Sequence, residues 1–150
     1  MAGIDIRHIP YKGSAIALTD LVGGQVSMTF TSMAAVQAFV RNGRLRLLAV
    51  TSAKRSPLAA STPTIAESGV PGFDMRGWNA MVAPRGTVKI AVDRLNAEII
   101  ATIKSPEARE RLAQQGYEPE AGTPQHLGDM IKSELARYGK LVKAVGMKAE

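Results

Sequence analysis

Two short polar stretches of this chain carry the residue types that bind small anions. The first contains Tyr11, Lys12, Gly13 and Ser14, and the second contains Thr31 and Ser32. Apolar residues recur at helical spacing directly after each polar stretch, which predicts a helix there. Each polar stretch would then lie at the start of a helix, where free backbone N–H groups and the positive end of the helix dipole are presented. The pattern predicts a site for an anion, particularly a carboxylate. Ordinary capping of the two helices, with Ser14 as the first cap, explains the same hydroxyls, and the residue types leave both interpretations open.

The residue types and spacings required for other chemistry are missing. The sequence has no cysteine, which excludes disulfides, thiol nucleophiles and thiolate metal sites. Its two histidines, His8 and His126, show no metal-ligand spacing, and no carboxylate pair, nucleophile elbow or phosphate-binding glycine loop is present. We therefore expect no catalytic residue, metal or cofactor, and a binding protein in place of an enzyme. Trp78, the single tryptophan, suits either a ligand wall or a packing role at a hinge.

The composition limits the classes of partner. The 150 residues include 19 Lys and Arg against 13 Asp and Glu, which gives a net charge of +6. The densest basic stretch holds only Arg41, Arg44 and Arg46, so we expect no nucleic-acid partner and a surface compatible with anionic solutes. No apolar run approaches the ~18 residues of a membrane-spanning helix, and the first residues lack a signal-peptide pattern. As written, the chain is expected to be soluble and cytoplasmic.

The first half of the chain alternates between strand and helix patterns. Segments 4–9, 25–30 and 45–50 read as strands, and segments 15–22 and 33–41 read as amphipathic helices that end at glycine. This order predicts an α/β fold of parallel Rossmann-like units with helices on both faces of the sheet. Both polar stretches then lie at the carboxyl edge of the sheet, where open α/β folds bind ligands.

The second half differs in pattern. Residues 51–77 form a long irregular stretch, which a crossover between two lobes would explain, and an apolar strand follows up to residue 83. Helices are expected at 88–103, from Ser105-Pro106 to about 116, and after Thr123-Pro124.

Collinear motifs along the chain resemble one receptor family. They include HIPYKG at 8–13, ALTDLVGGQV at 17–26, LAVTSAKRS at 48–56, PTIAESGVPGF at 63–73, Trp78, APRGT at 83–87, LNAE at 95–98, GTP at 122–124 and ARYGKLVK at 136–143. In these motifs the sequence resembles the Bug family, the periplasmic solute receptors of tripartite tricarboxylate transporters.

The resemblance implies a periplasmic-binding-protein-like fold with an incomplete two-lobe architecture. The chain looks like the carboxyl-terminal half: residues 1–77 would form most of the second lobe without its first strand and helix. Residues 78–150 would form a crossover strand and helices that return to the first lobe. A small organic carboxylate would bind at residues 11–14 and 31–32 and at Trp78, and the membrane subunits of the transporter would be partners of the full-length protein. Many relatives carry Asp where Thr31-Ser32 stands, which disfavours an amino-acid ligand.

A second hypothesis is a truncated, stand-alone α/β domain without transport function. Half a cleft lacks the contacts of the closing lobe, so we expect weak carboxylate affinity of this chain alone. An exposed sheet edge would favour self-association, which makes an interaction module the alternative to a receptor.

Overall fold

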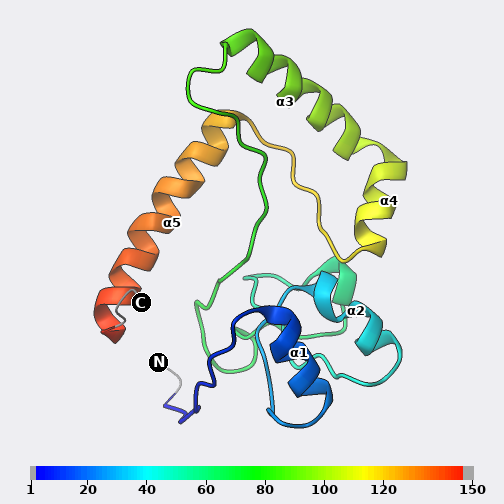
Figure 1. The fold of residues 1–150 in the computed structure, drawn as a ribbon, viewed down its shortest axis with the longest axis vertical. Helices are drawn as coiled ribbons and strands as arrows, with labels where there is room; N and C mark the ends of the chain where they lie inside the picture. The colour runs from blue at the N-terminus through cyan, green and yellow to red at the C-terminus, as the bar shows by residue number, and fades with distance from the viewer. Residues whose placement is uncertain (1–2, 147–150) are drawn as a thin grey trace. The chain divides into compact units, whose positions relative to one another are not determined.

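The computed structural model describes residues 3–146 as helices joined by long irregular segments (Figure 1). The helices are α1 (Ser14–Val22), α2 (Met33–Arg41), the short 3-10 helix η1 (Pro57–Ala59), α3 (Lys89–Lys104), α4 (Pro106–Gln114) and α5 (Pro124–Val145). The helices predicted from apolar spacing are therefore present, with bounds that differ by one or two residues.

The helix starts follow two different patterns. Thr123 caps α5 through its hydroxyl, which accepts the His126 backbone N–H at 3.1 Å, and Ser105 likewise accepts the Ala108 N–H at 3.2 Å before α4. The prediction that Ser14 caps α1 is wrong. Gly13 is the N-cap, and Ser14 is the first helical residue.

The predicted parallel sheet is not confirmed. Within residues 3–146, the only β-pairing is one parallel bridge between Val50 and Thr64, in which the Val50 N–H donates to Pro63 at 2.9 Å. The segments predicted as strands at 4–9 and 25–30 form no ladder in this range. A strand requires a neighbour in hydrogen-bonding register, and neither segment has one.

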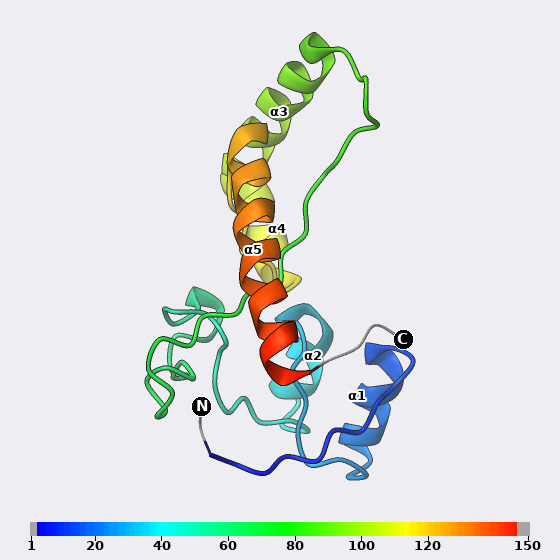
Figure 2. The ribbon, with the colours of Figure 1, turned by 90° about the vertical axis from the view of Figure 1, so that its left-hand side faces the viewer.

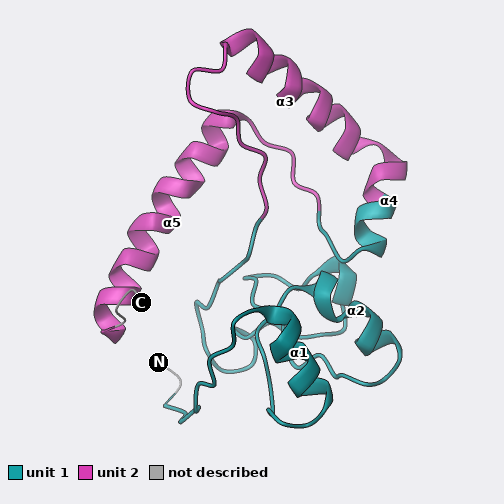
Figure 3. Cartoon of the chain, in the orientation of Figure 1, with its two compact units in different colours: residues 1–78, 110–118 teal, residues 79–109, 119–150 magenta. Residues whose placement is uncertain are grey.

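Contacts divide the chain into two compact units (Figure 3). The first extends to Trp78 and includes residues 110–118, and the second comprises residues 79–109 and the chain from Pro119 onward. These units are defined by contacts within this chain and do not identify the lobes of a receptor. The assignment of residues 1–77 and 78–150 to receptor lobes therefore stays a prediction.

The first unit is held by a small polar network around Glu67. The Arg55 guanidinium contacts the Glu67 carboxylate at 2.9 Å, and that carboxylate also accepts the Thr64 backbone N–H at 2.7 Å. The Glu67 N–H donates in return to the Thr64 hydroxyl at 3.0 Å, and Thr64 is 1% exposed. These bonds fix the irregular stretch that follows the third predicted strand.

Apolar burial is sparse. Val36 of α2, which is 6% exposed, is the one buried apolar side chain among the described residues. Ser105 alone separates α3 from α4, and the boundary between the two units falls within α4, after Arg109. In the second unit α5 runs unbroken for 22 residues (Figures 1 and 2). None of the described residues of this unit is fully buried. Most apolar side chains of the first unit are only half-buried, and most of those in the second unit are exposed.

Candidate functional site

The first polar stretch lies at the amino-terminal end of α1. Gly13 has φ 156° and ψ 156°, a backbone conformation that favours glycine, and Ser14 begins the helix. The Ser14 hydroxyl makes no capping hydrogen bond, and both Lys12 and Ser14 are exposed. This end of the helix therefore presents free N–H groups, a hydroxyl and a nearby cation to solvent.

Tyr11 is tied to the far end of the same helix. Its hydroxyl donates to the Asp20 carboxylate at 2.7 Å, and the ring is partly buried. This hydrogen bond, with smaller effects of burial and of the negative charge, raises the pKa of Tyr11 above its ordinary value. Tyr11 thus fixes the loop onto α1. Nothing in the sequence singled out Asp20 beyond its place as a carboxylate in the last turn of the helix that follows the loop.

The second polar stretch lies at the start of α2. Ser32 is the N-cap residue with φ −73° and ψ 149°, and its side chain forms no capping bond. Thr31 and Ser32 are both exposed. Both α1 and α2 belong to the first unit and run in a similar direction in both views, so their first residues lie toward the same side of that unit (Figures 1 and 2).

Gly116, after α4, is a positioning residue that the sequence did not indicate. A Cβ atom placed on it would lie 2.6 Å from the Ala34 backbone nitrogen and 2.9 Å from the Met33 carbonyl carbon. Gly116 also has φ 81°. The backbone of residue 116 therefore packs directly against the first turn of α2, beside the predicted anion-binding residues.

Trp78 ends the first stretch of chain in the first unit and remains 45% exposed. Its ring makes no hydrogen bond or ring contact with other residues in the range 3–146. The roles of Trp78 as a ligand wall or as a packing residue stay predictions.

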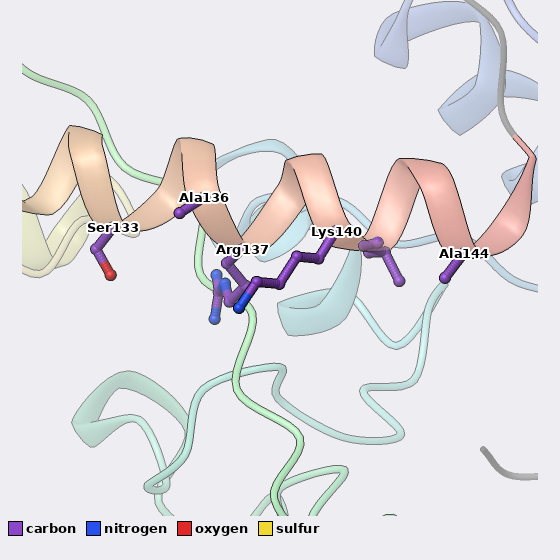
Figure 4. A pocket seen from close by; sticks show the side chains of 6 residues that line it. Ser133, Ala136, Arg137, Lys140 and Ala144 are labelled. Carbon is purple, nitrogen blue, oxygen red and sulfur yellow. The ribbon is translucent and has the colours of Figure 1, made fainter.

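A separate shallow hollow of about 550 Å³ follows one face of α5 (Figure 4). Arg137 and Lys140 point to the same side of the helix in this view. Arg137 donates to Glu134 at 2.8 Å and lies over the Tyr138 ring at 5.1 Å from its centroid. None of the predicted site residues lines this hollow, and a single helix face encloses no ligand.

Between residues 3 and 146, no three His, Asp or Glu side chains gather closely enough to hold a metal ion. No helix in that range combines the length and apolar character required to cross a membrane.

The family profile described as "Tripartite tricarboxylate transporter family receptor" matches residues 1–147. The chain belongs to this receptor family. The resemblance predicted from the sequence motifs is therefore confirmed. The family is one of substrate-binding receptors, in agreement with the expectation of a binding protein.

Curated members of the receptor family match almost the whole chain. A UPF0065 protein from the tcbD-tcbE intergenic region of Pseudomonas sp. strain P51 is 42% identical over 94% of this chain and 42% of its own length. The protein BugT of Bordetella pertussis is 38% identical over 97% of this chain and 45% of its own. A UPF0065 protein from the clcB-clcD intergenic region of Pseudomonas knackmussii is 37% identical and is covered over 84% of its length.

Solved receptor structures share the backbone path. The Rhodopseudomonas palustris protein Rpa4515, solved with adipate, has a TM-score of 0.87 and 40% identity, with 96% of this chain and 48% of that chain covered. The periplasmic binding protein BugD has a TM-score of 0.81 and 35% identity, with 99% and 50% covered. MatC from the same R. palustris, solved with malate, has a TM-score of 0.76 and 30% identity, with 93% and 48% covered.

The chain thus spans about half the length of most relatives that it matches. Its likeness to periplasmic binding proteins confirms the broad fold class, although the sheet ladder is absent from residues 3–146.

Proposed function

We propose that this chain forms part of an extracytoplasmic solute receptor that binds a small organic carboxylate for a tripartite tricarboxylate transporter. The observation that carries the proposal is the pair of helix starts in the first unit, each with a hydroxyl residue that makes no capping bond. Free N–H groups and a positive dipole end attract a carboxylate. Two solved members of the family hold dicarboxylates, adipate and malate, which supports this ligand class.

The proposed contacts come from both polar stretches. Ser14 and the N–H groups at the start of α1 bind one carboxylate oxygen, and Thr31 with Ser32 binds from the start of α2. Lys12 adds positive charge from the exposed loop. Tyr11 positions that loop through its bond to Asp20, and Trp78 supplies an apolar wall.

The same proposal includes the cellular location of the receptor and its protein partners. The complete receptor acts in the periplasm and delivers its solute to the membrane subunits of the transporter. Residues 1–77 form most of one lobe, without its first strand and helix, and residues 78–150 return to the other lobe. This chain is a fragment of that architecture, so its own affinity for the carboxylate is weak because the closing lobe supplies the other contacts.

Ligand-observed NMR can measure such weak binding with the 150-residue chain as it exists. We expect adipate to bind and adipamide, its uncharged analogue, to bind at least about tenfold more weakly, because charge-assisted hydrogen bonds are roughly twice as strong as neutral ones. Ser14→Ala combined with Thr31→Ala lowers adipate binding, whereas the control Ser61→Ala, in an exposed turn, leaves it unchanged. Equal binding of adipate and adipamide, or no effect of the double substitution, would contradict the proposed site.

A second candidate function is an interaction module that associates with itself. The observation in its favour is the exposure of large apolar side chains such as Ile4 at 69%, Phe30 at 65% and Val82 at 79%. Size-exclusion chromatography with light scattering separates the two candidates. A stable dimer that ignores carboxylates favours the module, and a monomer at high concentration excludes it.

A further inference from the structure

The start of α2 receives little support from its own side chains. Ser32 makes no capping bond, and the helix has only nine residues, whereas isolated helices shorter than about 12–15 residues are marginal in water. The other end is continued by its own chain, because the Arg44 and Leu45 N–H groups donate to the Phe39 carbonyl at 2.8 and 3.2 Å. The first turn, which carries the proposed carboxylate contacts, therefore depends on contacts with distant residues.

The end of α4 and the residues that follow it, 110–118, belong to the first unit (Figure 3). The Tyr117 N–H donates to the Leu112 carbonyl at 2.9 Å around Gly116, which is the Schellman pattern that ends a helix at a glycine. This turn places the Gly116 backbone against α2, where a Cβ on residue 116 would lie 2.6 Å from the Ala34 nitrogen. The end of α4 therefore packs on the first turn of α2.

Two hydrogen bonds hold the same segment at its ends. The Gln37 side chain of α2, with its amide oriented to satisfy both polar atoms, donates to the Gln114 carbonyl at 2.8 Å. At the other end, the buried Ser56 hydroxyl donates to the Glu118 carboxylate, 62 residues further along the chain. We call residues 114–118 the strap. The strap is fixed at both ends and packs against α2 between them.

We propose that the strap positions the start of α2 for carboxylate binding, and that Glu118 is a positioning residue that acts through α2 without touching the ligand. This inference rests on the proposed function, since it concerns the same carboxylate site. A docked strap and a bound carboxylate favour the same arrangement of the first turn, so each strengthens the other. Groups that are already held in place bind a ligand better than groups that must be ordered on binding.

Substitutions at Glu118 test the strap by ligand-observed NMR with adipate and the full 150-residue chain. Glu118→Ala removes the acceptor of the Ser56 hydroxyl, and we expect it to weaken adipate binding about fivefold or more. Glu118→Gln removes the same charge but keeps a carbonyl oxygen for that hydroxyl, so it retains most of the affinity. The control Gln115→Ala, at an exposed strap position, leaves the affinity unchanged. Wild-type affinity in Glu118→Ala, or equal losses in Glu118→Ala and Glu118→Gln, would overturn the proposal.

A double-mutant comparison separates positioning of α2 from a general loss of stability. Thr31→Ala lowers adipate affinity less in the Glu118→Ala chain than in the wild type, because the start of α2 is already displaced there. Ser14→Ala, at the start of α1, lowers the affinity equally in both chains. Equal costs of Thr31→Ala in the two backgrounds would overturn the proposal.

Reciprocity between the strap and the site supplies a further readout. Adipate should slow amide hydrogen exchange at Gly116 and Tyr117, whose N–H groups form the turn that ends α4. Adipate binding that leaves exchange at these two amides unchanged overturns the strap alone. Absence of adipate binding to the wild type overturns the proposed function and the strap with it.

Discussion

At the scale of single residues, charge and hydrogen bonding decide the local structure of the first unit. Glu67 accepts the Thr64 N–H and contacts Arg55, and both interactions favour its ionised form. The Thr64 hydrogen bond is the larger cause, and together they hold the pKa of Glu67 below its ordinary value of 4.5. A carboxylate in this position links the stability of the irregular stretch to pH.

Acid should weaken the first unit through Glu67. Because the folded-state pKa is lowered, the ionised carboxylate stabilises the fold above the ordinary value, and this contribution is lost as the pH falls through the lowered pKa. We expect Glu67→Gln to reduce the urea-unfolding midpoint at neutral pH and to match the wild type at acid pH. The control Glu98→Gln changes a carboxylate that contacts no cation in the described residues. A difference between wild type and Glu67→Gln that persists in acid would contradict this explanation.

At the scale of elements, local patterns predicted the helices but not the sheet. Caps such as Thr123 and the apolar spacing of α2 act within a few residues, so the sequence carried both signals. Strand pairing depends on a neighbour that is distant in sequence, and segments 4–9 and 25–30 find none in the described chain.

The candidate site was predictable only in part, because local patterns do not indicate contacts between residues that are distant in sequence. The start of α2 at Met33 follows from local pattern, whereas α1 begins at Ser14, one residue before the predicted start, with Gly13 as its N-cap. The contact of Gly116 with Ala34 joins residues that are far apart in sequence, and no local signal marked it.

Gly116 should be sensitive to substitution. Gly116→Ala forces a Cβ atom against the backbone at the start of α2 and strains a positive φ, so we expect a loss of more than about 1 kcal/mol in unfolding free energy. Gly139→Ala, within α5 and with open space around it, should instead stabilise by about 0.5–1 kcal/mol. Chemical denaturation measures both, and a neutral Gly116→Ala would show that the close approach does not hold α2.

At the scale of the whole molecule, burial of apolar side chains is sparse although the backbone follows the path of the family's solved structures. Val36 is the single buried apolar side chain in residues 3–146, and extended segments keep a receptor-like path without a sheet. Composition alone does not reveal this exposure, because the chain is 45% hydrophobic. The alternation of Ile4 and Ile6 predicted a strand, whereas the absence of its neighbour became evident only in the structure.

The most direct test of the proposed carboxylate site is to map where a carboxylate binds. Amide NMR shifts of the ¹⁵N-labelled chain are recorded with adipate and, separately, with adipamide. We expect that adipate alone shifts the amides at the start of α1, near Gly13 and Ser14, and at the start of α2, near Ser32 and Met33. Shifts confined to other positions, such as Ser133 and Lys140 on α5, or identical shifts with both compounds, would contradict it.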